Sequence, residues 1–176
     1  MNLFKRLNRY LDGIGHDIRL FNPKAALITC VITLILGMIT WFIGGSCNTV
    51  TLLYVFPRWA ISTGIMYVLW AVSFLFIGII LGGIMFGCEK FKRREAIKAT
   101  IFLFLSFIFT LCVYPTFFKA LAPFITFILL LLSALFCLFA LMIVKRIFAL
   151  WTIMLGLYIF WLVFNGYLSL VFALIN

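Results

Sequence analysis

Residues 60–87 read AISTGIMYVLWAVSFLFIGIILGGIMFG and contain no charged side chain. A helix needs about 20 apolar residues to cross the hydrocarbon core of a bilayer, so this stretch predicts a membrane-spanning helix. Four more uncharged stretches meet the same condition. We expect helices over about 25–45, 60–87, 97–117, 120–144 and 147–174, the last two joined by a tight hairpin at Lys145 and Arg146.

The composition indicates that lipid is the solvent for most of the chain. Of the 176 residues, 67% are hydrophobic and 10% are charged, and the mean hydropathy is +1.30. A soluble domain of this length needs far more polar surface to cover its core. The sequence therefore predicts an all-α integral membrane bundle of five transmembrane helices over 25–176, preceded by a cytoplasmic segment over 1–24.

That first segment predicts an amphipathic helix on the membrane surface. Apolar side chains recur at helical spacing, and the charged ones lie elsewhere around the helix. The apolar set is Leu3, Leu7, Leu11, Ile14, Ile18 and Phe21. No small-residue cleavage site follows, so we do not expect a cleavable signal peptide.

Basic residues are distributed unevenly between the two ends of the predicted helices. All but two of the 14 lysines and arginines fall on the side of the N-terminus, and the exceptions are Arg58 and Lys119. By the positive-inside rule, the N-terminus is cytoplasmic and the C-terminus lies outside, as in a multi-pass protein of the cell membrane. This placement favours anionic lipid head groups over nucleic acid as the partner of the +10 net charge.

Ionisable carboxylates and imidazole are confined to the segments outside the predicted spans. The four acids are Asp12, Asp17, Glu89 and Glu95, and the one histidine is His16. Coupled transporters and pumps place such groups at membrane depth, and acid–base catalysis needs them in a site, so neither function is expected. The five cysteines form no C-x-x-C and no Cys/His cluster, so we expect neither a metal site nor a cofactor.

Aromatic residues, which make up 19% of the chain, gather on particular helix faces. Helical spacing puts Trp70 and Phe74 on one face of helix 60–87, and Tyr158 and Trp161 on one face of helix 147–174. Periodicity alone is compatible with two interpretations. These faces are packing surfaces, or they are walls of a ligand pocket.

Three motifs resemble those of the TspO/translocator-protein family, the tryptophan-rich sensory proteins, which are five-helix membrane proteins of about this length. Residues 70–78, WAVSFLFIG, are similar to the family's W-x-x-x-Y-x-x-M-G. Residues 110–118, TLCVYPTFF, are similar to N-x-x-W-S-P-x-F-F, and residues 157–169, LYIFWLVFNGYLS, resemble P-Y-x-x-W-x-x-F-A-x-Y-L-N. The chain departs from the family pattern at Ile61, Ser62, Thr110, Val113 and Leu157.

The resemblance implies a pocket for a hydrophobic ligand, above all a porphyrin, between the helices and beneath the first outer loop. It places Trp70 and Trp161 on either side of the ligand. The other implied wall residues are Phe74, Thr110, Phe117, Tyr158 and Phe164. We expect a sensor or regulator that binds a tetrapyrrole. An uncoupled carrier for tetrapyrroles or lipids and a scaffold without a ligand are the alternatives, and some family members promote light-dependent porphyrin breakdown.

Glycine spacing in helix 60–87 and the loop before it lead to two further expectations. The spacings Gly78-x-x-x-Gly82 and Gly83-x-x-x-Gly87 allow close approach of helix backbones, either within the chain or across a homodimer seam. The polar, glycine-rich loop before Pro57 is expected to cover the pocket. In that loop Arg58 would meet an acidic ligand group, or else a lipid phosphate.

Overall fold

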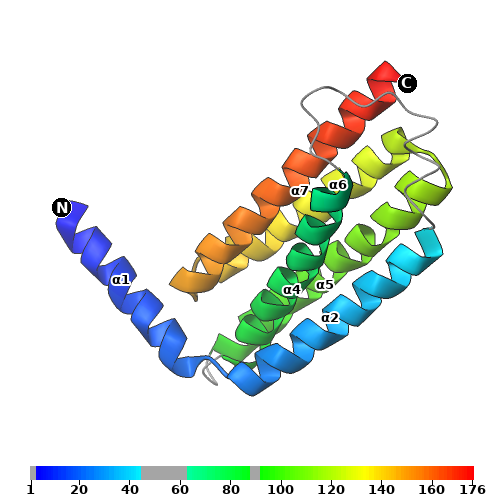
Figure 1. The fold of residues 1–176 in the computed structure, drawn as a ribbon. Helices are drawn as coiled ribbons and strands as arrows, with labels where there is room; N and C mark the ends of the chain where they lie inside the picture. Colours follow the sequence, from blue (N-terminus) through cyan, green and yellow to red (C-terminus); the bar gives the residue numbers. More distant parts are fainter. Residues whose placement is uncertain (1–2, 45–62, 88–91) are drawn as a thin grey trace.

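The computed structural model describes residues 3–44, 63–87 and 92–176, and within them the chain is almost entirely helical (Figure 1). The elements are α1 (Leu3–Leu20), α2 (Pro23–Gly44), α4 (Thr63–Phe86), α5 (Arg93–Tyr114), the short π-helical turn η2 (Pro115–Lys119), α6 (Pro123–Val144) and α7 (Ala149–Ile175). Five of these helices are long and apolar enough to cross a membrane. The predicted all-α, five-helix membrane bundle is therefore confirmed, and the chain is a multi-pass membrane protein.

The helix boundaries lie within a few residues of those predicted, with two differences in the third span. This helix begins at Arg93 rather than near 97, because the charged turn before the apolar stretch is helical as well. It also continues past Pro115 as the π-helical turn to Lys119, instead of ending at 117. Proline cannot donate a backbone hydrogen bond, so the regular α-helical pattern changes there.

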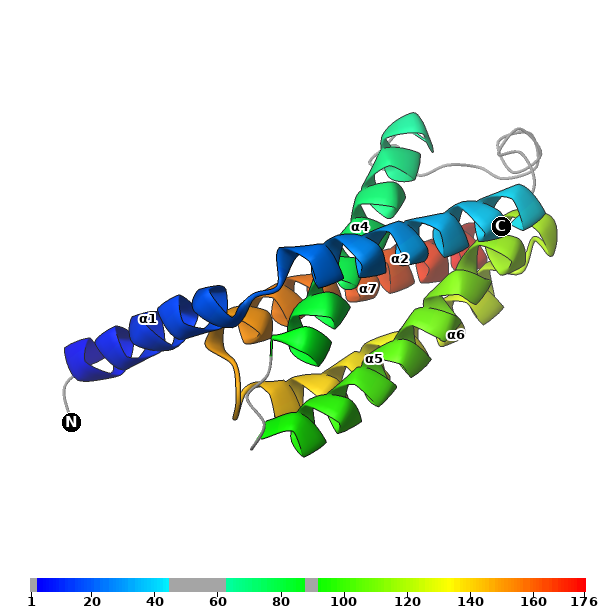
Figure 2. The same cartoon turned by 90° about the horizontal axis from the view of Figure 1, so that it is seen from below.

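The helices pack so that α4 holds the central position (Figures 1 and 2). It contacts α2, α5 and α7, while α6 packs between α5 and α7. In the most apolar part of α4, 56% of the residues are buried, against 17% in α2. Residues of α4 are thus the ones most able to touch several other helices at once.

Small residues bring α2 and α4 into backbone contact. A methyl group at Gly82 would lie 2.7 Å from the Cα atom of Ala26, and one at Gly78 would lie 2.6 Å from the Cα atom of Cys30. Across the same seam, Thr29 donates a hydrogen bond of 2.7 Å to the carbonyl oxygen of Gly78. In the structure, these glycines therefore pack against a helix of the same chain, which is one of the two interpretations of their spacing.

Hydroxyl groups join α5 to α6 in the interior of the bundle. The Oγ atoms of Ser106 and Ser133 lie 2.7 Å apart, and Ser133 Oγ lies 2.8 Å from Thr110 Oγ1. The thiol of Cys137 completes the group at 3.0 Å from Ser106 Oγ. Ser106, Thr110, Ser133 and Cys137 are fully buried. This polar cluster binds the two helices together, because hydroxyl groups in a bilayer interior have few other partners.

The glycine seam makes a substitution test available. We expect Gly82→Leu to destabilise the detergent-solubilised protein by about 1–3 kcal/mol, because the new side chain would overlap α2. Gly156→Leu is the matched control, since a methyl group there would have no atom of another described helix within 4 Å. Thermal unfolding followed by circular dichroism would measure both. Equal stability of the two variants would contradict the proposed role of Gly82.

The polar cluster allows a second test. Ser133→Ala should lower the free energy of unfolding by about 1 kcal/mol, because it removes the hydroxyl that bridges Ser106 and Thr110. Thr100→Val is the control, since the Thr100 hydroxyl donates within its own helix, to the carbonyl oxygen of Ala96, and to no other helix of the described residues. Unfolding in mixed micelles would compare them, and a larger loss for Thr100→Val would contradict the cross-helix role.

Candidate ligand-binding site

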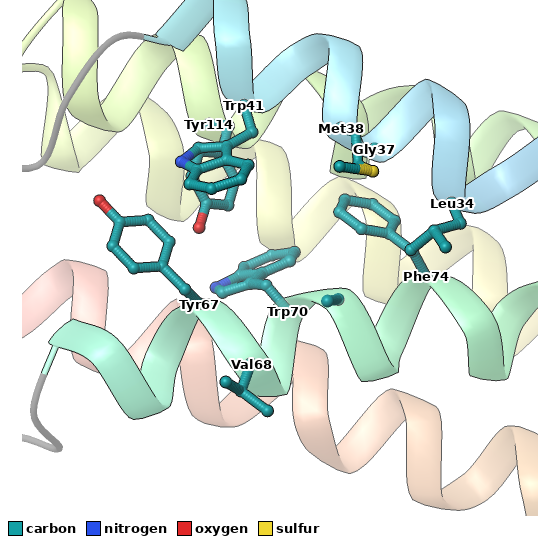
Figure 3. A pocket seen from close by; sticks show the side chains of 10 residues that line it. Leu34, Gly37, Met38, Trp41, Tyr67, Val68, Trp70, Phe74 and Tyr114 are labelled. Atoms are coloured by element: carbon teal, nitrogen blue, oxygen red, sulfur yellow. The ribbon is translucent and has the colours of Figure 1, made fainter.

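A cavity of about 250 Å³ lies between α2 and α4, closed at one side by the last residue of α5 (Figure 3). It is lined by Leu34, Gly37, Met38 and Trp41 of α2, by Tyr67, Val68, Trp70, Ala71 and Phe74 of α4, and by Tyr114 of α5. Every lining side chain is apolar or aromatic. On each of the two long helices, the lining residues include the positions i, i+3, i+4 and i+7, which form one continuous helix face.

Gly37 determines how closely Phe74 packs against α2. A methyl group at Gly37 would overlap the ring of Phe74. Because Gly37 has no side chain, the ring can pack directly against the backbone of α2. Phe74 is almost fully buried and also contacts Phe107 edge-on, with ring centroids 6.1 Å apart. The Phe74 ring therefore packs between α2 and α5 and forms part of the cavity wall.

Trp70 forms the wall between the cavity and α7. Its indole is 5% exposed and meets Tyr114 edge-on at a centroid distance of 5.8 Å. On its other side it meets Trp161 of α7 edge-on at 6.0 Å. Edge-to-face contacts of this kind add to the energy of area burial. Trp70 thus links the cavity to the interior of the bundle.

The mouth of the cavity is also aromatic. Tyr67 lies 5.5 Å from Trp41 and 6.1 Å from Tyr114, measured between ring centroids. Figure 3 shows Tyr67, Trp70 and Phe74 extending from α4 toward α2. A ligand in this cavity would meet π faces and edges on both sides.

The residues named from the sequence occupy different positions relative to this cavity. Trp70 and Phe74 line it. Trp161 contacts the side of Trp70 that faces away from the cavity. It stacks with Phe164 at a ring-centroid distance of 6.1 Å, so Trp161 and Phe164 form a second layer of aromatic rings behind the cavity wall. Phe117 packs edge-on against Phe172 at 5.5 Å.

Thr110 and Tyr158 belong to the interior rather than to the cavity wall. Thr110 is part of the polar cluster between α5 and α6. Tyr158 is fully buried next to Thr110 and Cys137. Arg58 and the loop expected to cover the pocket lie outside the described residues.

Two buried polar atoms stand out among the described residues. The Nε1 atom of Trp161 is buried and makes no hydrogen bond within this part of the chain, while the hydroxyl oxygen of Tyr158 is buried beside the Thr110 side chain without a hydrogen bond of standard geometry. Buried polar atoms of this kind are uncommon and call for an explanation. Both atoms belong to the face of α7 that the sequence singled out.

The sequence did not reveal the contribution of α2. Leu34, Gly37, Met38 and Trp41 repeat the spacing of the α4 lining residues, and this repeat was the available signal. Spacing alone could not show which helix lies beside α4.

Comparison with known proteins does not identify a family or a site: no protein-family model matches this chain, and no curated protein matches it in sequence.

The contact between Gly37 and Phe74 provides a test of the cavity's geometry. Gly37→Ala should destabilise the protein by about 1–3 kcal/mol, because the added methyl group displaces the ring. In the Phe74→Leu background the same change should cost less, since the smaller side chain leaves room. Thermal unfolding of the four proteins gives the coupling energy. An unchanged cost in the Phe74→Leu background would contradict the contact.

Proposed function

We propose that this protein binds a flat, hydrophobic ligand of the tetrapyrrole class in the cavity between α2 and α4 and acts as a sensor or regulator. The observation that carries the proposal is the aromatic lining of the cavity, with Trp70 at its inner wall. A flat macrocycle gains most from π faces in an apolar site with few polar groups. The motif resemblance to the TspO/translocator-protein family is consistent with this ligand class.

The position of the cavity suggests how such a ligand would reach it. The lining residues Met38, Trp41 and Val68 are 44%, 41% and 62% exposed, and they belong to helices that can span the bilayer. Side chains exposed there face acyl chains rather than water. A hydrophobic ligand dissolved in the bilayer would therefore meet the cavity from the side, between α2 and α4.

The cavity as it stands is too small to enclose a tetrapyrrole. A volume of about 250 Å³ is below the roughly 300–1,000 Å³ usual for drug-sized ligands. A tetrapyrrole would protrude toward the lipid or displace Trp70 from its contact with Trp161. Displacement would bring the ligand to the Nε1 atom of Trp161, which could then donate a hydrogen bond.

Packing beyond the cavity favours binding over passage through the protein. Toward the α1 end, α2 and α4 are in backbone contact at Gly78 and Gly82. This contact closes the seam in which the cavity lies. A carrier would need that seam to open, so we favour a sensor or regulator, with the N-terminus on the cytoplasmic side as the basic residues predict.

Ligand binding can be tested by titrating protoporphyrin into the solubilised protein while following tryptophan fluorescence. Trp70→Ala should weaken binding by roughly thirtyfold, equivalent to about 2 kcal/mol, since a buried aromatic anchor is lost. Trp161→Ala should weaken binding as well, because Trp161 supports Trp70. Trp→Phe at these positions should cost less, since a π face remains.

Trp151→Phe is the control for this titration. Trp151 is buried, but it packs against Gly83 and does not line the cavity. Its change to Phe should leave protoporphyrin affinity unaltered. Equal affinities of folded Trp70→Ala, Trp161→Ala and Trp151→Phe proteins would mean that the tryptophans serve packing alone.

A further inference from the structure

Helix α1 is fixed to the first turn of α7. The Oδ2 atom of Asp17 accepts a hydrogen bond of 2.9 Å from the backbone N–H of Leu150, and Asp17 is only 3% exposed. The first N–H groups of a helix have no partner within the helix, and the helix dipole favours a negative charge there. Asp17 supplies both the acceptor and the charge to α7.

Two more contacts support this attachment. Gly13 lies one turn before Asp17, and a methyl group there would be 3.2 Å from the Cβ atom of Ala149. At the end of α1, the ring of Phe21 lies 5.6 Å from that of Trp151. The helix is therefore held at a defined position and rotation.

That rotation leaves two different faces of α1 exposed. Leu11 and Ile18 lie seven residues apart, hence on one face, and are 56% and 58% exposed. Asp12 and Arg19 share the next face round and are exposed as well. One helix thus presents a face to the bundle, an apolar face and a charged face.

The level of α1 relative to the bilayer follows from its neighbours. It ends at Leu20, α2 begins at Pro23, and α7 begins at Ala149. Two membrane-spanning helices therefore start beside it, which places α1 at the boundary between hydrocarbon and head groups. Figure 1 shows α1 turning sharply away from α2 at this end of the bundle.

Exposed basic side chains gather at the same end. They include Arg19, Lys24, Arg93, Arg94, Lys145 and Arg146. At the opposite end of the bundle, the described residues include only Lys119 as a basic residue. Acidic lipids are the complementary partner for such a surface.

We propose that α1 is an interfacial helix that binds anionic phospholipid, with Leu11 and Ile18 inserted among the acyl chains. In this arrangement Arg19 and the basic end of the bundle meet the lipid phosphates. Asp17 sets the rotation of α1 by its bond to α7. This proposal is independent of ligand binding between α2 and α4.

Spin labels on the full chain in nanodiscs test the orientation. Nitroxides at positions 11 and 18 should collide more with oxygen than with a water-soluble nickel chelate, and those at 12 and 19 should show the reverse. The native cysteines other than the buried Cys137 would first be replaced by serine, so that the label attaches only at the chosen position. Equal accessibility at all four positions, or shielding of 11 and 18 from both reagents as in a protein contact, would overturn the proposal.

Lipid charge and Asp17 provide two further readouts. Adding phosphatidylglycerol to phosphatidylcholine nanodiscs should increase the depth of the position-18 label in the bilayer. Arg19→Gln should reduce that increase in depth. Asp17→Ala should abolish the difference in reagent accessibility between labels at positions 18 and 19. It should also raise the rate of amide hydrogen exchange at Leu150 severalfold. Asp17→Asn, which keeps an acceptor oxygen, should preserve most of the difference. No effect of phosphatidylglycerol, or a preserved difference in Asp17→Ala, would contradict the proposal.

Discussion

Backbone contact between α2 and α4 governs how the other parts of the bundle, the cavity included, are arranged. Gly78 and Gly82 allow α2 to approach so closely that a methyl group at either position would collide with it. Within a bilayer, such contact supplies van der Waals packing and short hydrogen bonds in place of a hydrophobic driving force. The same pair of helices then carries Trp41, Tyr67 and Trp70 toward its other end, where bulky rings keep the helices from closing. Contact at one end and aromatic bulk at the other together produce the cavity.

Polar side chains inside the bundle contribute cohesion between helices. Thr29 and Thr33 donate hydrogen bonds from α2 to the backbone carbonyl oxygens of Gly78 and Phe74 on α4. The hydroxyl of Ser133 joins α6 to α5 in the same way. Trp161 differs, since its buried Nε1 atom makes no such bond among the described residues. In the binding mode proposed above, this atom would donate a hydrogen bond to a polar group of the ligand.

The number and limits of the spans could be predicted because hydropathy and charge are local properties of the sequence. The face carrying Trp70 and Phe74 could be predicted for the same reason, since helical spacing is local too. The partnership of α4 with α2 could not, because spacing within one helix does not specify its neighbour. Gly37 illustrates the limit: its role depends on Phe74, a residue far away in the sequence. Asp17 is similar, because only the fold shows that its carboxylate meets the start of α7.

Photo-crosslinking can locate the hydrophobic ligand that we propose for the space between α2 and α4. A porphyrin carrying a diazirine group would be bound to the protein in nanodiscs, irradiated with ultraviolet light and located by peptide mass spectrometry. Adducts are expected within 34–41 and 67–74, and excess protoporphyrin should suppress them. Adducts spread over the lipid-facing surface of α6, or insensitive to protoporphyrin, would contradict it.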